Sequence, residues 1–296
     1  MSYPEAFSFR RYLAAKRTVD DRALHRPTLD RLSDAVTDRD SLRVLEVAAG
    51  IGTGLQRLLA WDCLPDRLDY TLLDSDAGCV ETARDRLTTW ATDTGYEVEE
   101  TDGALELTRD TESVVVGFET ADALDYAAQV DDRFDLLVGQ AFLDIVDLDD
   151  ALPALFDLVA DGGLAYFPVT FDGVTHFGPV ADPELEAAVL DAYHATMDAP
   201  DRPGGSTTGR DLLAAVPDAG GEVVAAGGSD WLVHPPYPAD EAYFLHHLVD
   251  TVAGAVEGDV SDEDRRTWAT ERHEAVATEE LTYLAHNLDV LARVSR

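Results

Sequence analysis

The chain has 296 residues and a formal net charge of −37, because 59 acidic residues stand against 22 basic ones. Hydrophobic residues make up 46 %, enough for the core of one large domain with appended helices. An acidic surface repels phosphate backbones, so we expect no nucleic-acid partner. No apolar run of about 18 residues and no apolar leader segment occurs, so we expect no membrane span and a cytoplasmic location.

The acidic residues are spread between stretches with apolar periodicity, which indicates a folded protein with an acidic surface. Molar salt screens charges beyond about 3 Å, so this composition is typical of an extreme halophile. We expect the stability to rise with salt. Cys63 and Cys79 are too few for a disulfide framework, and we expect both to be buried thiols.

Basic residues gather at the start of the chain. Residues 1–31 hold seven Arg or Lys against four acids, and Lys16 is the only lysine. We expect a helical cap over residues 1–40, with two short helices in 7–37. This segment is either the solvated face of a helix or a basic cap over an anionic ligand.

Apolar runs that alternate with helical patterns predict an α/β fold, with a doubly wound and mostly parallel sheet of seven strands. A β-hairpin with a tight turn at Asp102-Gly103 interrupts the alternation. The five strands expected first, apart from the hairpin at 96–109, cover 43–49, 70–73, 113–118, 134–139 and 164–169.

The second half of the chain predicts a lid, the last two strands and a helical end. A helix at 182–198 and a flexible stretch at 200–206 form a lid insertion over about 172–206. A helix at 209–216 and strands at 222–226 and 230–233 follow, and then a proline-rich break at 234–238. Two helices, 239–256 and 261–293, end the chain. The expected units are a cap (1–40), a sheet domain (41–236) and a C-terminal helical segment (237–296).

The sequence Glu46-Val-Ala-Ala-Gly-Ile-Gly-Thr-Gly54 joins the first strand to a helix. Glycines there let the backbone approach a ligand, and the helix presents free N–H groups. Leu55 stands where a dinucleotide fingerprint needs its third glycine, which disfavours a nicotinamide cofactor. No Gly-Lys-Ser/Thr tripeptide exists, which disfavours a P-loop.

The motif and four later segments, in the same order, resemble class I S-adenosylmethionine (SAM)-dependent methyltransferases. The resemblance covers roughly residues 40–235 and implies a Rossmann-like sheet that binds SAM. One departure is Ala48, where the family usually has its first glycine. The segments that carry the resemblance are 44–52, 73–87, 118–124, 134–143 and 158–164.

The resemblance also implies roles for single residues. Asp74, followed by Ser75, would accept the ribose hydroxyls, although a helix cap is the alternative. Asp122 would accept the adenine amino group beside the backbone of Ala123, although it can also be a turn former. The remaining expected cofactor contacts are Glu46 at the ligand ammonium or the loop, Ala48, Gly50 and Gly52 around the methionine part, and Gln140 near the sulfonium.

Methyl transfer from a sulfonium is an in-line displacement, so alignment carries much of the catalysis and a base is needed only for an acceptor that must lose a proton. No catalytic dyad is evident. We rank His176 first and Gln140 second as catalytic residues, because they follow the fifth and fourth strands. Asp144 and Asp172 could hold Mg²⁺ in a catechol-type enzyme, but we expect no metal. Further acceptor-side candidates are Tyr193, His194, Tyr237, His246 and His247.

The predicted function is therefore SAM-dependent methylation of a small molecule, and the basic N-terminal segment favours an anionic one. The alternatives are a non-catalytic SAM-binding protein, an aminopropyltransferase, and, least favoured, a nicotinamide oxidoreductase. The C-terminal helices could pair in a homodimer.

Overall fold

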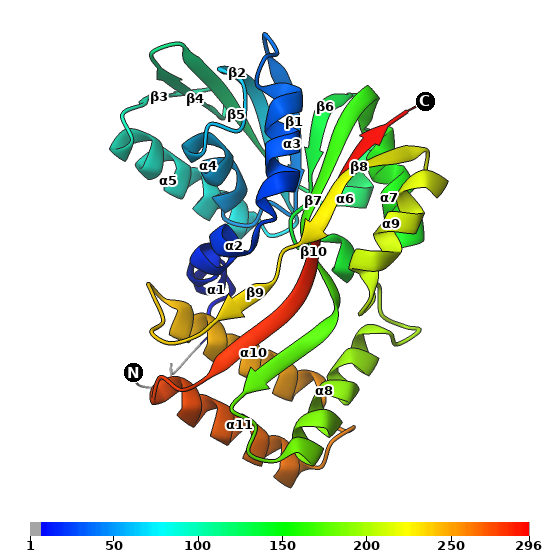
Figure 1. The fold of residues 1–296 in the computed structure, drawn as a ribbon. Coiled ribbons are helices and arrows are strands. Elements are labelled where there is room, and N and C mark those ends of the chain that lie inside the picture. Colours follow the sequence, from blue (N-terminus) through cyan, green and yellow to red (C-terminus); the bar gives the residue numbers. More distant parts are fainter. Residues whose placement is uncertain (1–6, 296) are drawn as a thin grey trace.

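The computed structural model describes residues 7–295, and its centre is one mixed sheet of ten strands. The strand order is β3-β4-β5-β2-β1-β6-β7-β10-β8, with β9 paired to β10 (Figure 1). The strands are β1 (Leu42–Val47), β2 (Arg67–Asp74), β3 (Glu97–Thr101), β4 (Ala104–Arg109), β5 (Glu112–Thr120), β6 (Phe134–Val138), β7 (Val159–Gly178), β8 (Gly221–Gly228), β9 (Trp231–Val233) and β10 (Thr282–Val294).

The five central strands β5, β2, β1, β6 and β7 run parallel, as predicted, and the expected hairpin forms as β3 and β4 on one edge. Strands β10 and β8 add antiparallel strands beyond β7. Parallel strands need crossovers, and helices on both faces supply them.

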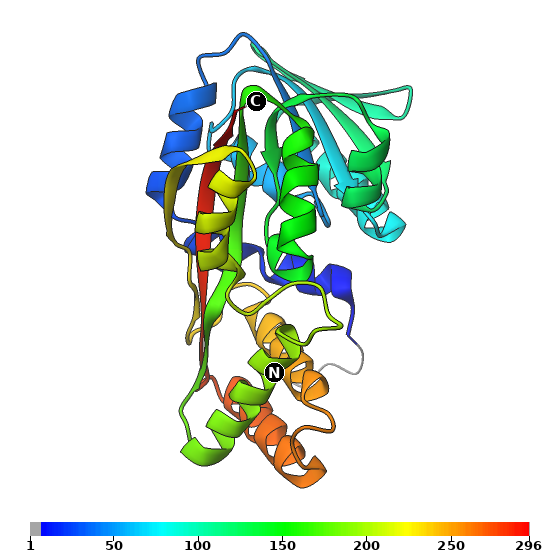
Figure 2. The ribbon, with the colours of Figure 1, turned by 90° about the vertical axis from the view of Figure 1, so that its right-hand side faces the viewer.

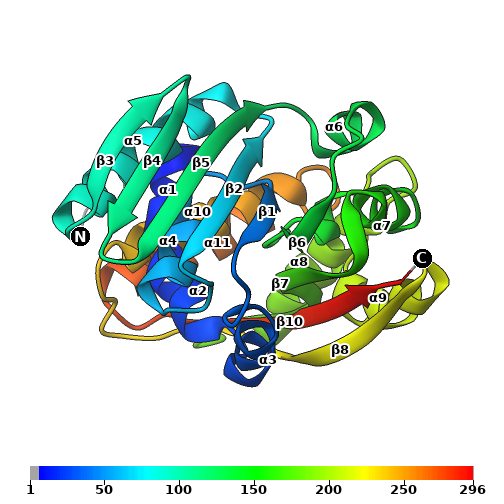
Figure 3. The ribbon, with the colours of Figure 1, turned by 90° about the horizontal axis from the view of Figure 1, so that it is seen from above.

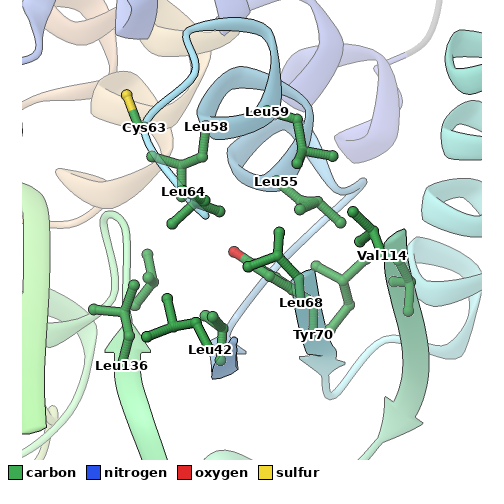
Figure 4. Close-up of a cluster of buried hydrophobic side chains, with 14 of the residues drawn as sticks. Leu42, Leu55, Leu58, Leu59, Cys63, Leu64, Leu68, Tyr70, Val114 and Leu136 are labelled. Atoms are coloured by element: carbon green, nitrogen blue, oxygen red, sulfur yellow. The ribbon is translucent and has the colours of Figure 1, made fainter. Parts of the chain in front are cut away.

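Helices cover both faces of the sheet and bury two apolar layers (Figure 3). One layer holds residues of α3, α4 and α5, with Leu55, Leu58 and Tyr70 at its centre (Figure 4). The other lies under α6, α7 and α9. These helices are α3 (Arg26–Val36), α4 (Thr53–Ala60), α5 (Ala77–Asp93), α6 (Ala123–Gln129), α7 (Leu148–Asp157) and α9 (Thr208–Asp218), with a short 3₁₀ turn η1 (Leu143–Ile145) before α7.

Strands β7 and β10 continue past the other strands, and a third apolar core forms around this extension (Figures 1 and 2). Helices α8 (Pro183–Met197), α10 (Glu241–Ala255) and α11 (Asp262–Ala277) pack there. Helices α1 (Phe9–Ala15) and α2 (Arg17–Ala23) bridge the two parts. The cap thus has three helices where two were predicted, and residues 1–6 lie outside the described part.

The predicted terminal helix at 261–293 is wrong in its second half. α11 ends at Ala277, and residues 282–294 form β10 between β7 and β8. The apolar residues of β10 are spaced irregularly, because its second half is buried on both faces. Residues 282–294 therefore belong to the sheet, although the predicted sheet domain ends at 236.

Candidate functional site

The loop between β1 and α4 is bent by three left-handed residues. Ala48, Gly50 and Gly52 have φ values of 49°, 55° and 74°. Gly52 also packs closely against α5, because a Cβ there would lie 3.3 Å from the Cβ of Ala83. Ala48 thus adopts a left-handed conformation, which glycine adopts without cost.

Glu46 lies buried beneath this loop, and its carboxylate accepts a hydrogen bond of 2.8 Å from the Tyr70 hydroxyl. Burial raises the pKa of Glu46 to about 7, although Tyr70 and Arg57 act in the opposite direction. A Cβ at Gly54 would lie 2.1 Å from Glu46 Oε1. The last glycine of the motif is thus required by the carboxylate that supports the loop.

Asp74 ends β2 and ties it to the glycine loop. Its Oδ2 accepts from the backbone N–H of Gly50 at 2.8 Å, and its Oδ1 accepts from Asp76 N–H at 2.9 Å. Each carboxylate oxygen has a second lone pair, so Asp74 can still accept hydroxyl groups from a ligand. Asp76, two residues later, caps α5. The helix cap that was the alternative role for Asp74 is therefore provided by Asp76.

A first cavity of about 230 Å³ opens above the loop. The cavity is lined by carboxylates from β1 and β2, by the backbone of the bent loop, and by side chains of α1. Among its lining residues are six of the nine expected cofactor contacts: Glu46, Ala48, Gly50, Asp74, Ser75 and Gln140.

Three expected contacts do not line this cavity. Gly52 begins α4 and faces α5. Asp122 caps α6 by accepting from the N–H groups of Leu124 and Asp125, and Ala123 is buried in the core. The turn-forming role thus accounts for the Asp122 side chain in this structure, and its adenine contact stays a prediction.

Gln140 is part of a polar network that joins the sheet to the cap. Its amide donates to Asp20 Oδ2 at 2.7 Å, and its carbonyl accepts from Arg57 at 2.8 Å. Asp20, fully buried, also accepts from the Trp231 indole at 2.9 Å and lies 3.5 Å from the Lys16 ammonium. With both ends of its amide engaged, Gln140 positions the cap above the first cavity.

His176 is exposed on the extension of β7, not on a loop after the strand. Its neighbours Thr175 and Phe177 are buried, so His176 faces the other side of the strand. It lines neither the first cavity nor the larger one beside it. The structure therefore does not bring His176 to the glycine loop, and the reason is that the strand runs nine residues beyond Val169.

A second cavity, of about 530 Å³, adjoins the first and shares the side chains of Phe9, Leu13, Lys16, Ala141 and Ile145 with it. Its position between the sheet edge, the cap and α8 and α10 suits a second ligand. Six of its lining residues are aromatic: Phe9, Tyr12, Phe171, Tyr193, Trp231 and Tyr283.

The N-terminal arginines mostly serve the fold. They bind acidic and aromatic partners outside the cavities, and Lys16 is the cation of this segment that lines both cavities. The contacts are Arg11 with Asp240, Arg17 with Asp21 and Gln56, Arg22 with Glu241, and Arg26 over the ring of Trp61.

The two acids weighed as Mg²⁺ ligands have different surroundings. Asp172 is engaged by the backbone N–H and side chain of Arg210, whereas Asp144 lines the second cavity. Within residues 7–295 no group of three His, Cys, Asp or Glu side chains is placed to hold a metal ion.

No helix within residues 7–295 is long and apolar enough to cross a membrane. Cys63 and Cys79 are free and buried, as expected.

No family model and no curated protein matches the sequence. Among solved structures, a proposed methyltransferase from Bacillus halodurans aligns with a TM-score of 0.52 and 12 % identity, over 91 % of this chain and all of that one. The chain has a methyltransferase fold. A SAM-dependent methyltransferase from Thiobacillus denitrificans, in complex with S-adenosylhomocysteine, aligns over both full chains with a TM-score of 0.49 and 17 % identity. At such identity the likeness concerns the fold, and function has to be argued from the site.

Several residues of the two cavities were not singled out from the sequence. Tyr12 and Leu13 sit in the cap, and Trp231 and Tyr283 come from β9 and β10. The one signal that could have marked this wall is Lys16, the only lysine of an acidic chain. The aromatic residues carry no local motif, because the cavity is assembled from segments far apart in sequence.

Proposed function

We propose that the chain is a SAM-dependent methyltransferase that acts on a small molecule. The observation that carries this proposal is Asp74, which holds the bent glycine loop through Gly50 and keeps free lone pairs toward the first cavity. The loop backbone and the helix that follows it suit the methionine part of SAM, and Asp74 suits the ribose. When bound, SAM supplies a methyl group already activated by its sulfonium charge.

The second cavity supports a separate acceptor. It meets the first along Ala141 and Ile145, after the fourth parallel strand, and Gln140 stands beside this junction. Alignment of acceptor and methyl group is the main requirement of the reaction, and a cavity held by packed aromatic side chains can provide it. The basic segment gives an anionic acceptor little support, because four of its six arginines are engaged outside the two cavities and Lys16 lies beside Asp20.

Calorimetric titration with SAM and S-adenosylhomocysteine in molar KCl tests the proposal. We expect binding by the native chain and at least a tenfold loss for Asp74→Ala. Asp182→Ala is the matched control, because Asp182 also accepts from two backbone N–H groups, at the start of α8, but lies outside the first cavity. Absence of binding, or unchanged binding by Asp74→Ala, would refute the proposal.

A SAM-binding protein without activity would give the same titration. Transfer of labelled methyl groups from SAM to cell metabolites separates the two functions, and an aminopropyl donor tested in parallel covers the transferase alternative.

The acidic composition supports a halophilic, cytoplasmic protein as a further proposal. Unfolding free energies measured from low to molar KCl test the salt dependence, and a stability independent of salt would contradict it. We also propose that the chain forms a homodimer through its C-terminal helices, of which the structure contains α10 and α11. Sedimentation in molar KCl would detect such a dimer.

A further inference from the structure

The second cavity holds one carboxylate with an oxygen for which the protein supplies no hydrogen-bond donor. Asp144, in η1, lines the cavity, and its Oδ1 is a buried atom without a hydrogen bond. Burial raises the pKa of Asp144 to about 6, although a hydrogen bond from its own backbone N–H and the charge of Lys16 act in the opposite direction. A buried polar atom without a partner is costly, and a ligand that binds it removes that cost.

The cations around this cavity either have other partners or lie exposed at its rim. Lys16 lies 3.5 Å from Asp20 and 5.0 Å above the ring of Trp231. His247 has its pKa lowered by burial, which keeps it neutral near pH 7, and Arg202 is exposed at the rim. Among the lining carboxylates described, Asp144 is thus the one with a buried oxygen that lacks a hydrogen bond.

Aromatic side chains line the same cavity as the Asp144 carboxylate. Burial raises the pKa values of Tyr12 and Tyr193, and the negative charge of Asp144 adds to both shifts, so its field reaches both rings. Trp231 already holds one cation, the Lys16 ammonium, over its face. Faces of aromatic rings attract cations, most strongly where water is excluded.

We infer that this cavity binds the methyl acceptor as a cationic amine, with its ammonium group against Asp144 and its apolar part among the aromatic rings. As the site of an acceptor the inference rests on the proposed function, but the binding itself is measurable separately. An anionic acceptor would face the Asp144 carboxylate, and a neutral one would leave its charge uncompensated.

Three probes of similar shape and different charge test this inference: 2-phenylethylamine, 2-phenylethanol and phenylacetate. Each is titrated calorimetrically into the native chain, alone and after saturation with S-adenosylhomocysteine. We expect the amine to bind at least tenfold more tightly than the other two, since a hydrogen bond between two charged groups is stronger than one that involves a neutral group. Equal or tighter binding of the alcohol or the acid, or no amine binding at millimolar concentration, would overturn the inference without any variant.

Variants of Asp144 then test whether its carboxylate is the group that binds the amine. Asp144→Asn should lose at least tenfold in amine affinity and keep its affinity for S-adenosylhomocysteine, whereas Asp144→Glu should keep the preference for the amine. Asp149→Asn removes an exposed charge nearby in α7 and should change nothing. Unchanged amine binding by Asp144→Asn refutes the role of Asp144. Failure to bind S-adenosylhomocysteine refutes the proposed function instead, so the two failures are distinguishable.

Discussion

The close approach of Glu46 to Gly54 makes a sharp prediction for the loop. In Gly54→Ala the new Cβ would lie 2.1 Å from Glu46 Oε1, so the carboxylate must move. Crowding in a packed site costs about 1–3 kcal/mol, and loss of the Tyr70 hydrogen bond to a charged group costs about 1.5–3 kcal/mol. Alanine in place of glycine in a helix returns about 1 kcal/mol. We therefore expect a net loss of about 1.5–5 kcal/mol in unfolding free energy.

The same substitution should change sign once the carboxylate is gone. In a Glu46→Ala background the added methyl group meets free space, and Gly54→Ala should stabilise by up to about 1 kcal/mol. Gly254→Ala is the matched control, because Gly254 is helical and a Cβ there meets nothing within 4 Å. Denaturant unfolding of the four chains of this double-mutant cycle in molar KCl gives the coupling free energy. Additive effects of the two substitutions would refute the steric account.

Three further predictions follow from contacts described above. Ala48→Gly should stabilise the chain by about 1 kcal/mol in thermal unfolding, because the left-handed φ strains alanine. Arg22→Ala should cost about 3 kcal/mol, since it leaves the buried Glu241 carboxylate without its cation, whereas the exposed Arg266→Ala should cost under about 0.5 kcal/mol. Because burial raises the folded-state pKa of Asp144 to about 6, its ionisation destabilises the fold as the pH rises from about 4 to 7. Asp144→Asn should therefore gain stability relative to the native chain between pH 4.5 and 8, by up to about 3 kcal/mol, and a pH-independent difference would contradict this.

Local patterns predicted the elements that depend on local chemistry. The glycine loop, the acid at the end of β2 and the hairpin turn at Asp102-Gly103 all form where expected, because each is dictated by backbone conformation at a strand end. The parallel strands followed from their unbroken apolar runs.

Properties that depend on distant segments were not predictable. Strand β10 looked helical because its partners, β7 and β8, lie far away in sequence, as do the helices α3 and α9 that pack against it. His176 looked like a loop residue because nothing local shows how far β7 extends. The unsatisfied oxygen of Asp144 could not be predicted either. It becomes apparent only when the cap, η1 and α8 are assembled around the second cavity.

The position of β10 has a consequence for biosynthesis. β10 is inserted between β7 and β8, which are synthesised more than a hundred and more than fifty residues before it, respectively. Until it arrives, the long β7 keeps an open edge, which is a template for wrong pairing. A chain that ends prematurely, even by its final 15 residues, is therefore expected to aggregate rather than to persist as a weakened enzyme.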